Sequence, residues 1–425
     1  MRKVRLKRFF TIFALIIAGE AIFGLPFLVA RIFRPTLLDV FGITNLELGT
    51  AFSVYGVVAM LAYFPGGALA DRFSARRMMT CALLISALGG IYYATIPDVA
   101  GLELLFGFWG ITTILLFWAA MIRATRNWGG TEGQGKAFGI LDGGRGLLAA
   151  ILATVTVAVF GALLPEDAAS ATLEQRTEAL KQVIWIFTGM TVFAGAVVWF
   201  CVPDDEVTSS EVQEHTSGGS NIRKVLQNPA VWLQGMIVVT AYTGYKGMDN
   251  LGLFASDVFG FNDVEAANVS TVAFWVRPIA ALCAGLIADK VGGARTIAAC
   301  FMAIILGDGV VALGWYDPSA AWMLFMLVVA ISAVVFSLRG IYFAIFDEAG
   351  VPAALTGTAV GLVSVVGYTP DIFMGPINGY LTDTYPGAEG HQYFFGVLAG
   401  FAVLGLICTL LFQRLASQRS TGTQE

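Results

Sequence analysis

Long apolar segments limit this chain to one class of fold. Of its 425 residues, 57% are hydrophobic and only 13% are charged, and the apolar residues fall in uninterrupted runs. A helix needs roughly 20 apolar residues to cross the hydrocarbon core of a bilayer. The alternating strands of about ten residues that indicate a membrane β-barrel are absent from the sequence. The sequence therefore predicts an all-α polytopic membrane protein.

Twelve runs are long enough to cross a membrane as helices. The first run follows a basic N-terminus, but no pattern of small residues marks a cleavage site at its end, so we expect an uncleaved first helix and not a signal peptide. The predicted spans are 9–33, 46–70, 77–97, 102–122, 136–164, 183–202, 229–255, 265–288, 296–315, 320–339, 355–382 and 391–414.

The placement of Lys and Arg predicts the orientation. With the N-terminus in the cytoplasm, most of these cations fall in cytoplasmic segments, and the outer loops clearly hold only Arg176 and Lys181. Cytoplasmic loops of membrane proteins are enriched in Lys and Arg, so both termini are predicted to be cytoplasmic. No organellar targeting segment is visible, which favours a bacterial inner (plasma) membrane.

One polar segment divides the predicted spans into two sets of six. Residues 203–228 contain three consecutive acids, Asp204, Asp205 and Glu206, then a Ser/Gly stretch. This composition is typical of a linker. We therefore expect an N-terminal bundle over 1–202, a cytoplasmic linker over 203–228 and a C-terminal bundle over 229–425.

A short pattern occurs once in each half, between the second and third spans. It is GALADRFSARR at 67–77 and GLIADKVGGAR at 285–295. Asp71 is equivalent to Asp289, and Arg77 to Arg295. The distance between equivalent residues is about half of the chain, so the pattern indicates two related six-helix bundles.

The pattern G-x-x-x-D-(R/K)-x-x-x-x-R at both places resembles the loop signature of the major facilitator superfamily. The resemblance covers nearly the whole chain. It implies twelve transmembrane helices in two pseudo-symmetric six-helix bundles and a central cavity that opens alternately to the two sides. The chain is loosely similar to the organophosphate:phosphate antiporter branch, where an Arg from the first helix of each half holds the anion. The matching positions here are Phe27 and Gly244, neither of which is basic.

The two loops are candidate gates. Each Asp can face the positive N-terminal end of a helix in the opposite part of the bundle, and the Arg residues can pair with carboxylates, when the cytoplasmic side is shut. Alternatively, the loop cations only set topology. Arg123 resembles the fourth-helix arginine of many superfamily members and Arg339 has a comparable place, although either could be a topology cation at a helix end. The predicted gating residues are Gly67, Asp71, Arg72, Arg77, Gly285, Asp289, Arg295, Arg123 and Arg339.

Ionisable residues inside the predicted spans are candidate functional groups, because each costs roughly 2.5–3.5 kcal/mol to insert into the membrane. Arg277 lies near the middle of its span, beside Pro278, and a guanidinium there suits a carboxylate, phosphate or sulfonate. The alternative is a buried structural ion pair with Glu20 or Asp371.

Lys246 and Asp249 are three residues apart, so on a helix they share a face and can neutralise each other. Two tyrosines, Tyr242 and Tyr245, lie nearby. The repeat places the equivalent of Lys246 within a turn of Arg31, so each half is expected to offer one cation from its first helix to a shared central site.

Asp142 and Arg145 are also three apart, and the spacing permits either an internal ion pair or a place in the site; Asp308 is expected to be structural or linked to coupling. The predicted substrate-binding residues are Arg277, Lys246, Arg31, Arg145, Tyr242, Tyr245 and Trp275. The predicted proton-coupling residues are Glu20, Asp142, Asp249 and Asp371.

These residues predict a secondary transporter for a small organic anion of the sugar-phosphate, carboxylate or sulfonate type, working as a proton symporter or antiporter. The first alternative is proton symport of a neutral sugar or nucleoside, with all cations internally paired. A membrane sensor is less favoured because no soluble domain is visible in the sequence.

No catalytic motif is visible, so no enzyme is expected. The five Cys lie singly in apolar runs and the two His are far apart, so no metal or cofactor is expected. The expected partners are a small-molecule solute and the lipid bilayer, with no nucleic acid, and the protein is expected to be monomeric.

Overall fold

Helices make up nearly all of the structure, a computed structural model that describes residues 2–130, 133–204, 225–343, 345 and 353–422. No strand occurs in those ranges. The first half contains α1 (Arg2–Phe23), η1 (Gly24–Leu28), α2 (Val29–Ile32), α3 (Arg34–Phe41), α4 (Asn45–Ala70), α5 (Ala75–Tyr93), α6 (Val99–Gly110), η2 (Ile111–Trp118), α7 (Ala119–Gly129), α8 (Gln134–Leu163), η3 (Ala168–Ser170) and α9 (Leu173–Cys201). The second half contains α12 (Pro229–Gly247), η5 (Met248–Asn250), α13 (Leu251–Phe259), α14 (Asp263–Val291), α15 (Gly293–Ala312), α16 (Ala321–Ile341), α17 (Ala353–Gly367), α18 (Pro370–Thr384) and α19 (Ala388–Gly422).

Ten helices in the described ranges are long and apolar enough to cross a membrane. The predicted spans 77–97 and 229–255 are not among the ten, and they correspond to α5 and to α12–α13. Helix α5 has only 19 residues and begins beside two arginines. Helix α12 carries Gln234 and Lys246 and is interrupted at η5. Both nevertheless pack within the bundle, α5 against α9 and α12 against α19.

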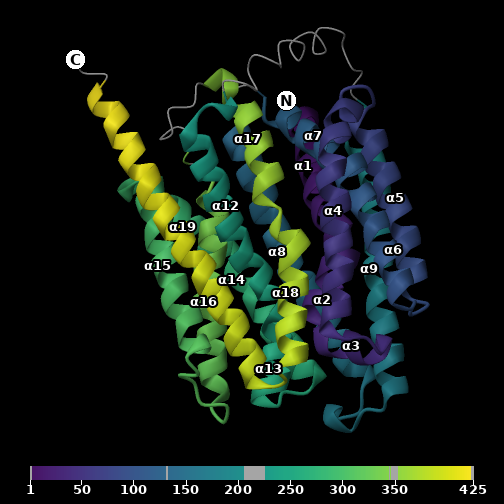
Figure 1. Ribbon diagram of the computed structural model, residues 1–425. Helices are drawn as coiled ribbons and strands as arrows, with labels where there is room; N and C mark the ends of the chain where they lie inside the picture. Colours follow the sequence, from purple (N-terminus) through teal and green to yellow (C-terminus); the bar gives the residue numbers. More distant parts are fainter. Residues whose placement is uncertain (1, 131–132, 205–224, 344, 346–352, 423–425) are drawn as a thin grey trace.

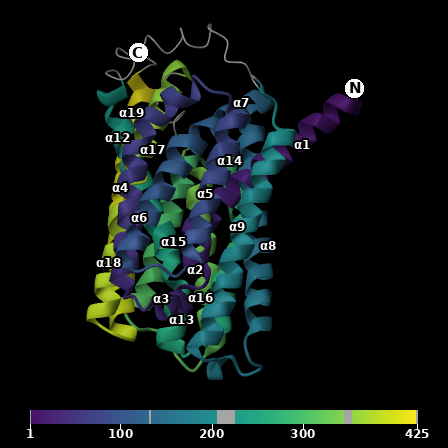
Figure 2. The same cartoon turned by 90° about the vertical axis from the view of Figure 1, so that its right-hand side faces the viewer.

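The two ends of the molecule differ in what they contain. The start of α1 and the end of α19 lie at one end, which we call the terminal end, and α3 and α13 lie at the other, which we call the distal end (Figure 1). In the view turned by 90°, the start of α1 projects from the side of the bundle (Figure 2). The predicted linker falls largely on 205–224, outside the described residues, so the division into 1–202, 203–228 and 229–425 stays a prediction.

Local sequence signals explain where several spans begin and break. Capping boxes start α4, with Thr44 and Glu47, and α14, with Asn262 and Glu265. Pro26 lies in the π-helical turn η1, where a residue without an N–H group is tolerated because the regular helical bonding is already interrupted. Pro370 is in the first turn of α18, the position in a helix that accepts proline.

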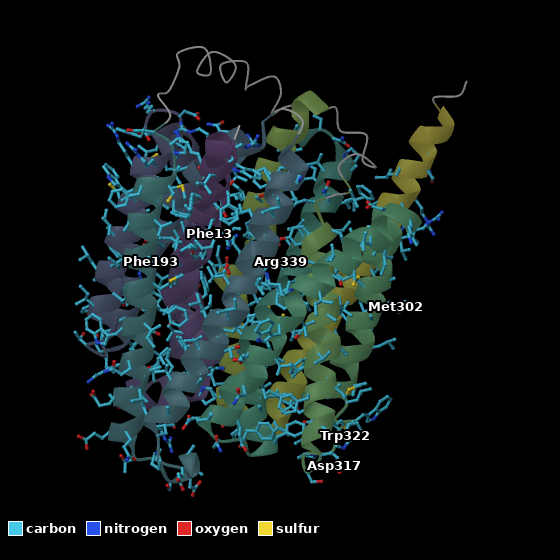
Figure 3. All side chains as sticks on the ribbon, turned by 180° about the vertical axis from the view of Figure 1, so that it is seen from behind. Phe13, Phe193, Met302, Asp317, Trp322 and Arg339 are labelled. Atoms are coloured by element: carbon cyan, nitrogen blue, oxygen red, sulfur yellow. The ribbon has the colours of Figure 1, made fainter. Side chains whose placement is uncertain are left out.

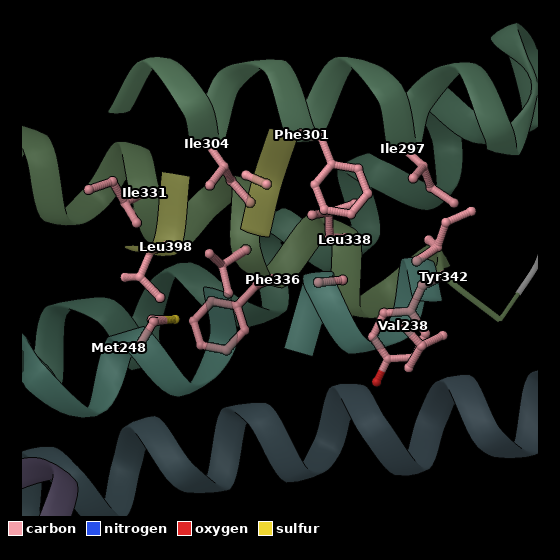
Figure 4. Close-up of a cluster of buried hydrophobic side chains, with 14 of the residues drawn as sticks. Val238, Met248, Ile297, Phe301, Ile304, Ile331, Phe336, Leu338, Tyr342 and Leu398 are labelled. Atoms are coloured by element: carbon pink, nitrogen blue, oxygen red, sulfur yellow. The ribbon is translucent and has the colours of Figure 1, made fainter. Parts of the chain in front are cut away.

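The apolar cores follow the two halves. One cluster of buried residues comes entirely from Val225 to Phe412 and includes Phe301 and Phe336 (Figure 4). A second cluster comes entirely from Ile12 to Val202. A third belongs to the first half except for two residues of α14. Most apolar packing is therefore within a half, and the halves meet along narrow seams.

The closest seam joins α4 to α18. A Cβ atom added to Gly49 would lie 2.4 Å from the carbonyl oxygen of Gly375, and one added to Gly379 would lie 2.3 Å from the Cα of Leu46. The backbones therefore touch because these positions have no side chain. Helices α8 and α14 form the second seam.

Polar contacts close the distal end across the two halves. The Asp383 carboxylate accepts hydrogen bonds from the backbone N–H groups of Asn45 (3.2 Å) and Leu46 (2.7 Å). On the other side, Thr36 donates to Asp263 (2.7 Å), which also pairs with Arg176 (3.2 Å). These bonds hold the halves together at the distal end.

Candidate functional site

A cavity lies between the two halves and contains about 940 Å³ of space, part of it open solvent. Nine of its 22 lining residues are aromatic. The charged lining residues are Glu20, Arg31, Arg145, Lys246, Arg277, Arg339 and Asp371. Because the distal end is closed by the contacts above, the cavity faces the terminal end.

A buried ion-pair network lies on the distal side of the cavity. Arg31 Nε donates to Asp249 Oδ1. Lys246 Nζ lies 2.7 Å from Asp249 Oδ2 and 3.4 Å from Asp371 Oδ1. The Tyr242 hydroxyl donates to Asp371 at 3.2 Å. The predicted pairing of Lys246 with Asp249 is therefore present, and Lys246 is shared between two carboxylates.

The Arg31–Asp249 pair joins equivalent positions of the repeat. The two residues are 218 apart, the same offset that relates Asp71 to Asp289. Arg31 Nη1 also donates to the Tyr245 hydroxyl at 2.8 Å. Asp249 reaches Arg31 from η5, where the helical path of α12 changes. Arg31 and Lys246, the two cations expected from the first helix of each half, both line the cavity and share Asp249 as a partner.

A second network lies around α14. Arg277 Nη2 is 3.0 Å from Asp142 Oδ1, and its Nη1 is 4.0 Å from Glu20 Oε1. Arg145 Nε is 3.3 Å from Glu20 Oε2. The expected alternatives for Arg277 included a pair with Glu20 or Asp371, and the structure adds Asp142 as its nearest partner. Asp142 and Arg145 do not pair with each other, because each reaches a different helix.

Arg339 lies inside the cavity wall, whereas the sequence placed it among the gating residues. Its guanidinium carbon is 4.0 Å from the centroid of the Tyr245 ring, and Nη1 is buried without a hydrogen-bond partner among the residues that the structure describes. Figure 3 labels Arg339 in the interior, well below the terminal end of the bundle. Helix α16 continues to Ile341, and Arg339 follows the buried Val335 by four residues, so it lies on the inward face. The sequence alone did not indicate this orientation, because the burial of Val335 is known only from the structure.

Trp275 lies outside the cavity, contrary to its prediction as a substrate-binding residue. Its side chain is 44% exposed, and its Nε1 donates to Thr154 of α8 at 2.9 Å. Positions two apart on a helix point to nearly opposite sides, so burial of Arg277 turns Trp275 outward. The other six predicted substrate-binding residues all line the cavity: Arg31, Arg145, Tyr242, Tyr245, Lys246 and Arg277.

Ion pairs and hydrogen bonds join the first signature loop to neighbouring segments of the first part of the chain. Arg76 and Arg77 pair with Asp204 at 2.5 and 3.1 Å. A hydrogen bond from Ser74, together with these two arginines, lowers the pKa of Asp204. Arg123 donates to the backbone oxygens of Ala70 and, at 2.6 Å, of Phe73. The Asp204 contacts join the start of α5 to the segment that follows α9, and the Arg123 contacts hold the end of α4 to α7.

The other predicted gating residues lie at or near the terminal end. Gly67 and Gly285 have open space where a Cβ atom would project. Arg72, Asp289 and Arg295 are exposed, and Asp71 is half-buried. Their gating role concerns a state with this end closed, and it stays a prediction.

The sequence from residue 9 to residue 374 matches the family model of the Major Facilitator Superfamily. The chain belongs to this superfamily. The predicted family and all-α fold are therefore confirmed, and the twelve helices of the superfamily comprise the ten long apolar spans together with α5 and α12–α13.

Relatives of this superfamily chain extend over its whole length. It is 30% identical to the inner membrane protein YqcE of Escherichia coli and 26% identical to YihN of the same organism, with 97% of both chains covered in each case. The structure resembles a bacterial homolog of the human lysosomal transporter Spinster in its inward-facing, unoccupied conformation, with a TM-score of 0.75, 15% identity and coverage of 97% and 98%. It also resembles the nucleoside transporter NupG, with a TM-score of 0.70, 14% identity and coverage of 96% and 98%. The chain is thus an integral membrane protein of a transporter family, and these findings point to a transporter and not to an enzyme.

Proposed function

We propose that this transporter moves a small organic anion by alternating access, as a proton symporter or antiporter. The observation that carries the proposal is the charge balance of the cavity. Five cations face it, and the carboxylates that pair with them are Glu20, Asp142, Asp249 and Asp371. Arg339 has no carboxylate within ion-pair distance among the described residues, and Asp142, a carboxylate with which it interacts electrostatically, is paired with Arg277. Because an unpaired buried charge is costly, an anion would be attracted to Arg339.

Shared carboxylates suit a proton-coupled mechanism. Lys246 lies between Asp249 and Asp371, and Glu20 lies between Arg145 and Arg277. An incoming anion that takes a cation from one of these acids leaves a carboxylate without its partner. That carboxylate can then accept a proton, so the movement of the anion is coupled to the movement of the proton.

The cavity faces the terminal end, which is cytoplasmic in the proposed orientation. For the site to open outward, the hydrogen bonds to Asp383 and Asp263 at the distal end would have to break. In that state the signature loops would close the terminal end. The relatives YqcE and YihN are inner membrane proteins, which supports a bacterial inner membrane location. We further propose that the protein acts as a monomer.

A neutral sugar or nucleoside is the second candidate substrate. The likeness to the nucleoside transporter NupG favours it, as does the pairing of four of the five cavity cations with carboxylates. In this alternative the role of Arg339 would be structural: its guanidinium would keep the Tyr245 ring in place and would bind no substrate.

Replacing Arg339 with glutamine separates the two candidates. A ligand at 100 times its Kd stabilises its protein by about 2.7 kcal/mol, so binding is visible as a raised melting temperature. We expect carboxylates, sulfonates or sugar phosphates to stabilise the wild type and to lose most of this effect in Arg339→Gln. The matched control is Lys290→Gln, which removes an exposed cation of the second signature loop. Stabilisation of both proteins by neutral nucleosides or sugars alone would reject the anion proposal.

A further inference from the structure

The cavity contains few neutral groups for binding hydroxyls. Among its described lining residues there is no Ser, Thr, Asn, Gln or His. The polar lining side chains are the seven charged ones, five tyrosines and Trp118. Moving a hydroxyl group from water into a site where it finds no hydrogen-bond partner costs free energy. A ligand with many hydroxyls would therefore bind weakly in this cavity.

Most of the phenol groups are already engaged. Tyr55 shares a hydrogen bond of 2.8 Å with Thr113, and Tyr242 donates to Asp371. Tyr245 accepts from Arg31. A ligand in the cavity would therefore contact these tyrosines chiefly through the apolar faces of their rings.

Two of the rings form a facing pair across the halves. Tyr63 of α4 and Tyr368, in the turn between α17 and α18, lie nearly parallel, with an interplanar angle of 19° and centroids 6.5 Å apart. This distance is near the upper limit for a stacked pair. Tyr368 also meets Tyr242 edge to face at 4.9 Å. A flat ring in the cavity would thus have aromatic partners from both halves.

The free cation lies beside this aromatic group. Arg339 is in contact with the Tyr245 ring, and Tyr245 packs on Tyr242 at 5.4 Å. Arg339 also interacts electrostatically with Tyr368. Its Nη1 is the buried cavity donor that has neither a hydrogen bond nor an ion-pair partner in the described part of the chain. One anionic group and one flat apolar body are the two features that this arrangement can recognise.

We infer that the substrate is an aromatic monoanion, in which one carboxylate or sulfonate is attached to a planar ring. The inference rests on the proposed function and narrows it, because it disfavours sugar phosphates among the candidate anions. The anionic group would bind Arg339, as a guanidinium presents several N–H donors to a carboxylate or sulfonate. The ring would pack against Tyr63 and Tyr368, so its binding would link the two halves.

A four-part ligand panel on the full-length protein tests the inference. The probes are benzoate and benzenesulfonate as aromatic anions, gluconate and glucose 6-phosphate as polyol anions, benzyl alcohol as a neutral aromatic, and uridine as a neutral nucleoside. Affinities are measured by calorimetric titration of the purified protein. We expect the aromatic anions to bind at least about tenfold more tightly than every other probe, since an aromatic contact and a charged hydrogen bond each contribute about 1 kcal/mol or more.

The outcomes separate this inference from the proposed function. Equal affinity for aromatic and polyol anions, or tighter binding of the polyol anions, would overturn the inference and leave the anion proposal intact. Binding of benzyl alcohol or uridine with no anion bound would overturn both. Binding of none of the probes would also count against both.

Substitutions at Tyr63 test the role of the ring itself. Tyr63→Phe keeps the ring and removes the hydroxyl, whereas Tyr63→Leu removes the ring. We expect benzoate affinity to be unchanged in Tyr63→Phe and to fall about three- to tenfold in Tyr63→Leu, with gluconate affinity the same in both. A similar loss in the two variants would contradict ring recognition. If Tyr63→Leu does not fold, the ligand panel on the wild type still decides the matter.

Discussion

Replacing Asp249 with alanine is expected to abolish transport and to lower the free energy of unfolding by about 3–5 kcal/mol, the usual cost of removing one partner from a buried ion pair. Asp249 is buried and binds both Arg31 and Lys246. Lys246 would keep Asp371 at 3.4 Å, but Arg31 would keep no carboxylate among its described contacts. Among those described contacts, the Tyr245 hydroxyl would be the only polar side-chain partner left to Arg31.

Thermal unfolding in detergent, combined with uptake into vesicles, measures both effects. The matched control is Glu178→Ala, which breaks the exposed pair with Lys181 at 2.8 Å and is expected to cost less than about 1 kcal/mol. The double variant Arg31→Leu with Asp249→Leu should recover much of the lost stability, because apolar residues can replace a buried pair at little cost. An Asp249→Ala protein as stable as the wild type would show that the pair does not hold the fold.

Replacing Gly49 with valine is expected to prevent the distal end from closing and to stop transport. A Cβ atom at this position would lie 2.4 Å from a backbone oxygen of α18, which no rotamer change can relieve. Overpacking of this kind costs about 1–3 kcal/mol, and an equilibrium between two states shifts about 5- to 150-fold for that difference. The population should therefore move toward a state in which α4 and α18 separate.

A thiol introduced at Leu28, on the cavity wall, reports this shift. A reagent that cannot cross the membrane should label Leu28→Cys from the distal side faster when Gly49→Val is present. The control is Gly189→Val, since a Cβ atom there meets open space. Equal labelling rates in the two backgrounds, with transport retained in Gly49→Val, would show that this seam need not close.

Much of the candidate site was predictable because intramembrane charge is rare and visible in a sequence. Arg277, Lys246, Arg31 and Arg145 stood out as costly residues in apolar runs, and all four line the cavity. The pairing of Lys246 with Asp249 also followed from their spacing, which is local to one helix turn and its neighbour.

Pairings between helices were not predictable in the same way. Arg277 meets Asp142, which lies 135 residues away on α8, and Arg145 meets Glu20 on α1. Trp275 turned out to face away from the cavity and Arg339 into it. Each of these depends on the rotation of one helix against another, and hydropathy does not specify that rotation.

By itself, the sequence determined the membrane-spanning class, the number of helices and the duplication. An apolar run of this length can cross the bilayer only as a helix, because the backbone must form its hydrogen bonds within the run. Only the tertiary structure decided which charges neutralise each other and which one, Arg339, is left without a carboxylate. That choice depends on contacts between helices far apart in the chain. The close backbone approach of Gly49 and Gly375 is likewise visible only in the structure, because no local pattern in the sequence reveals it.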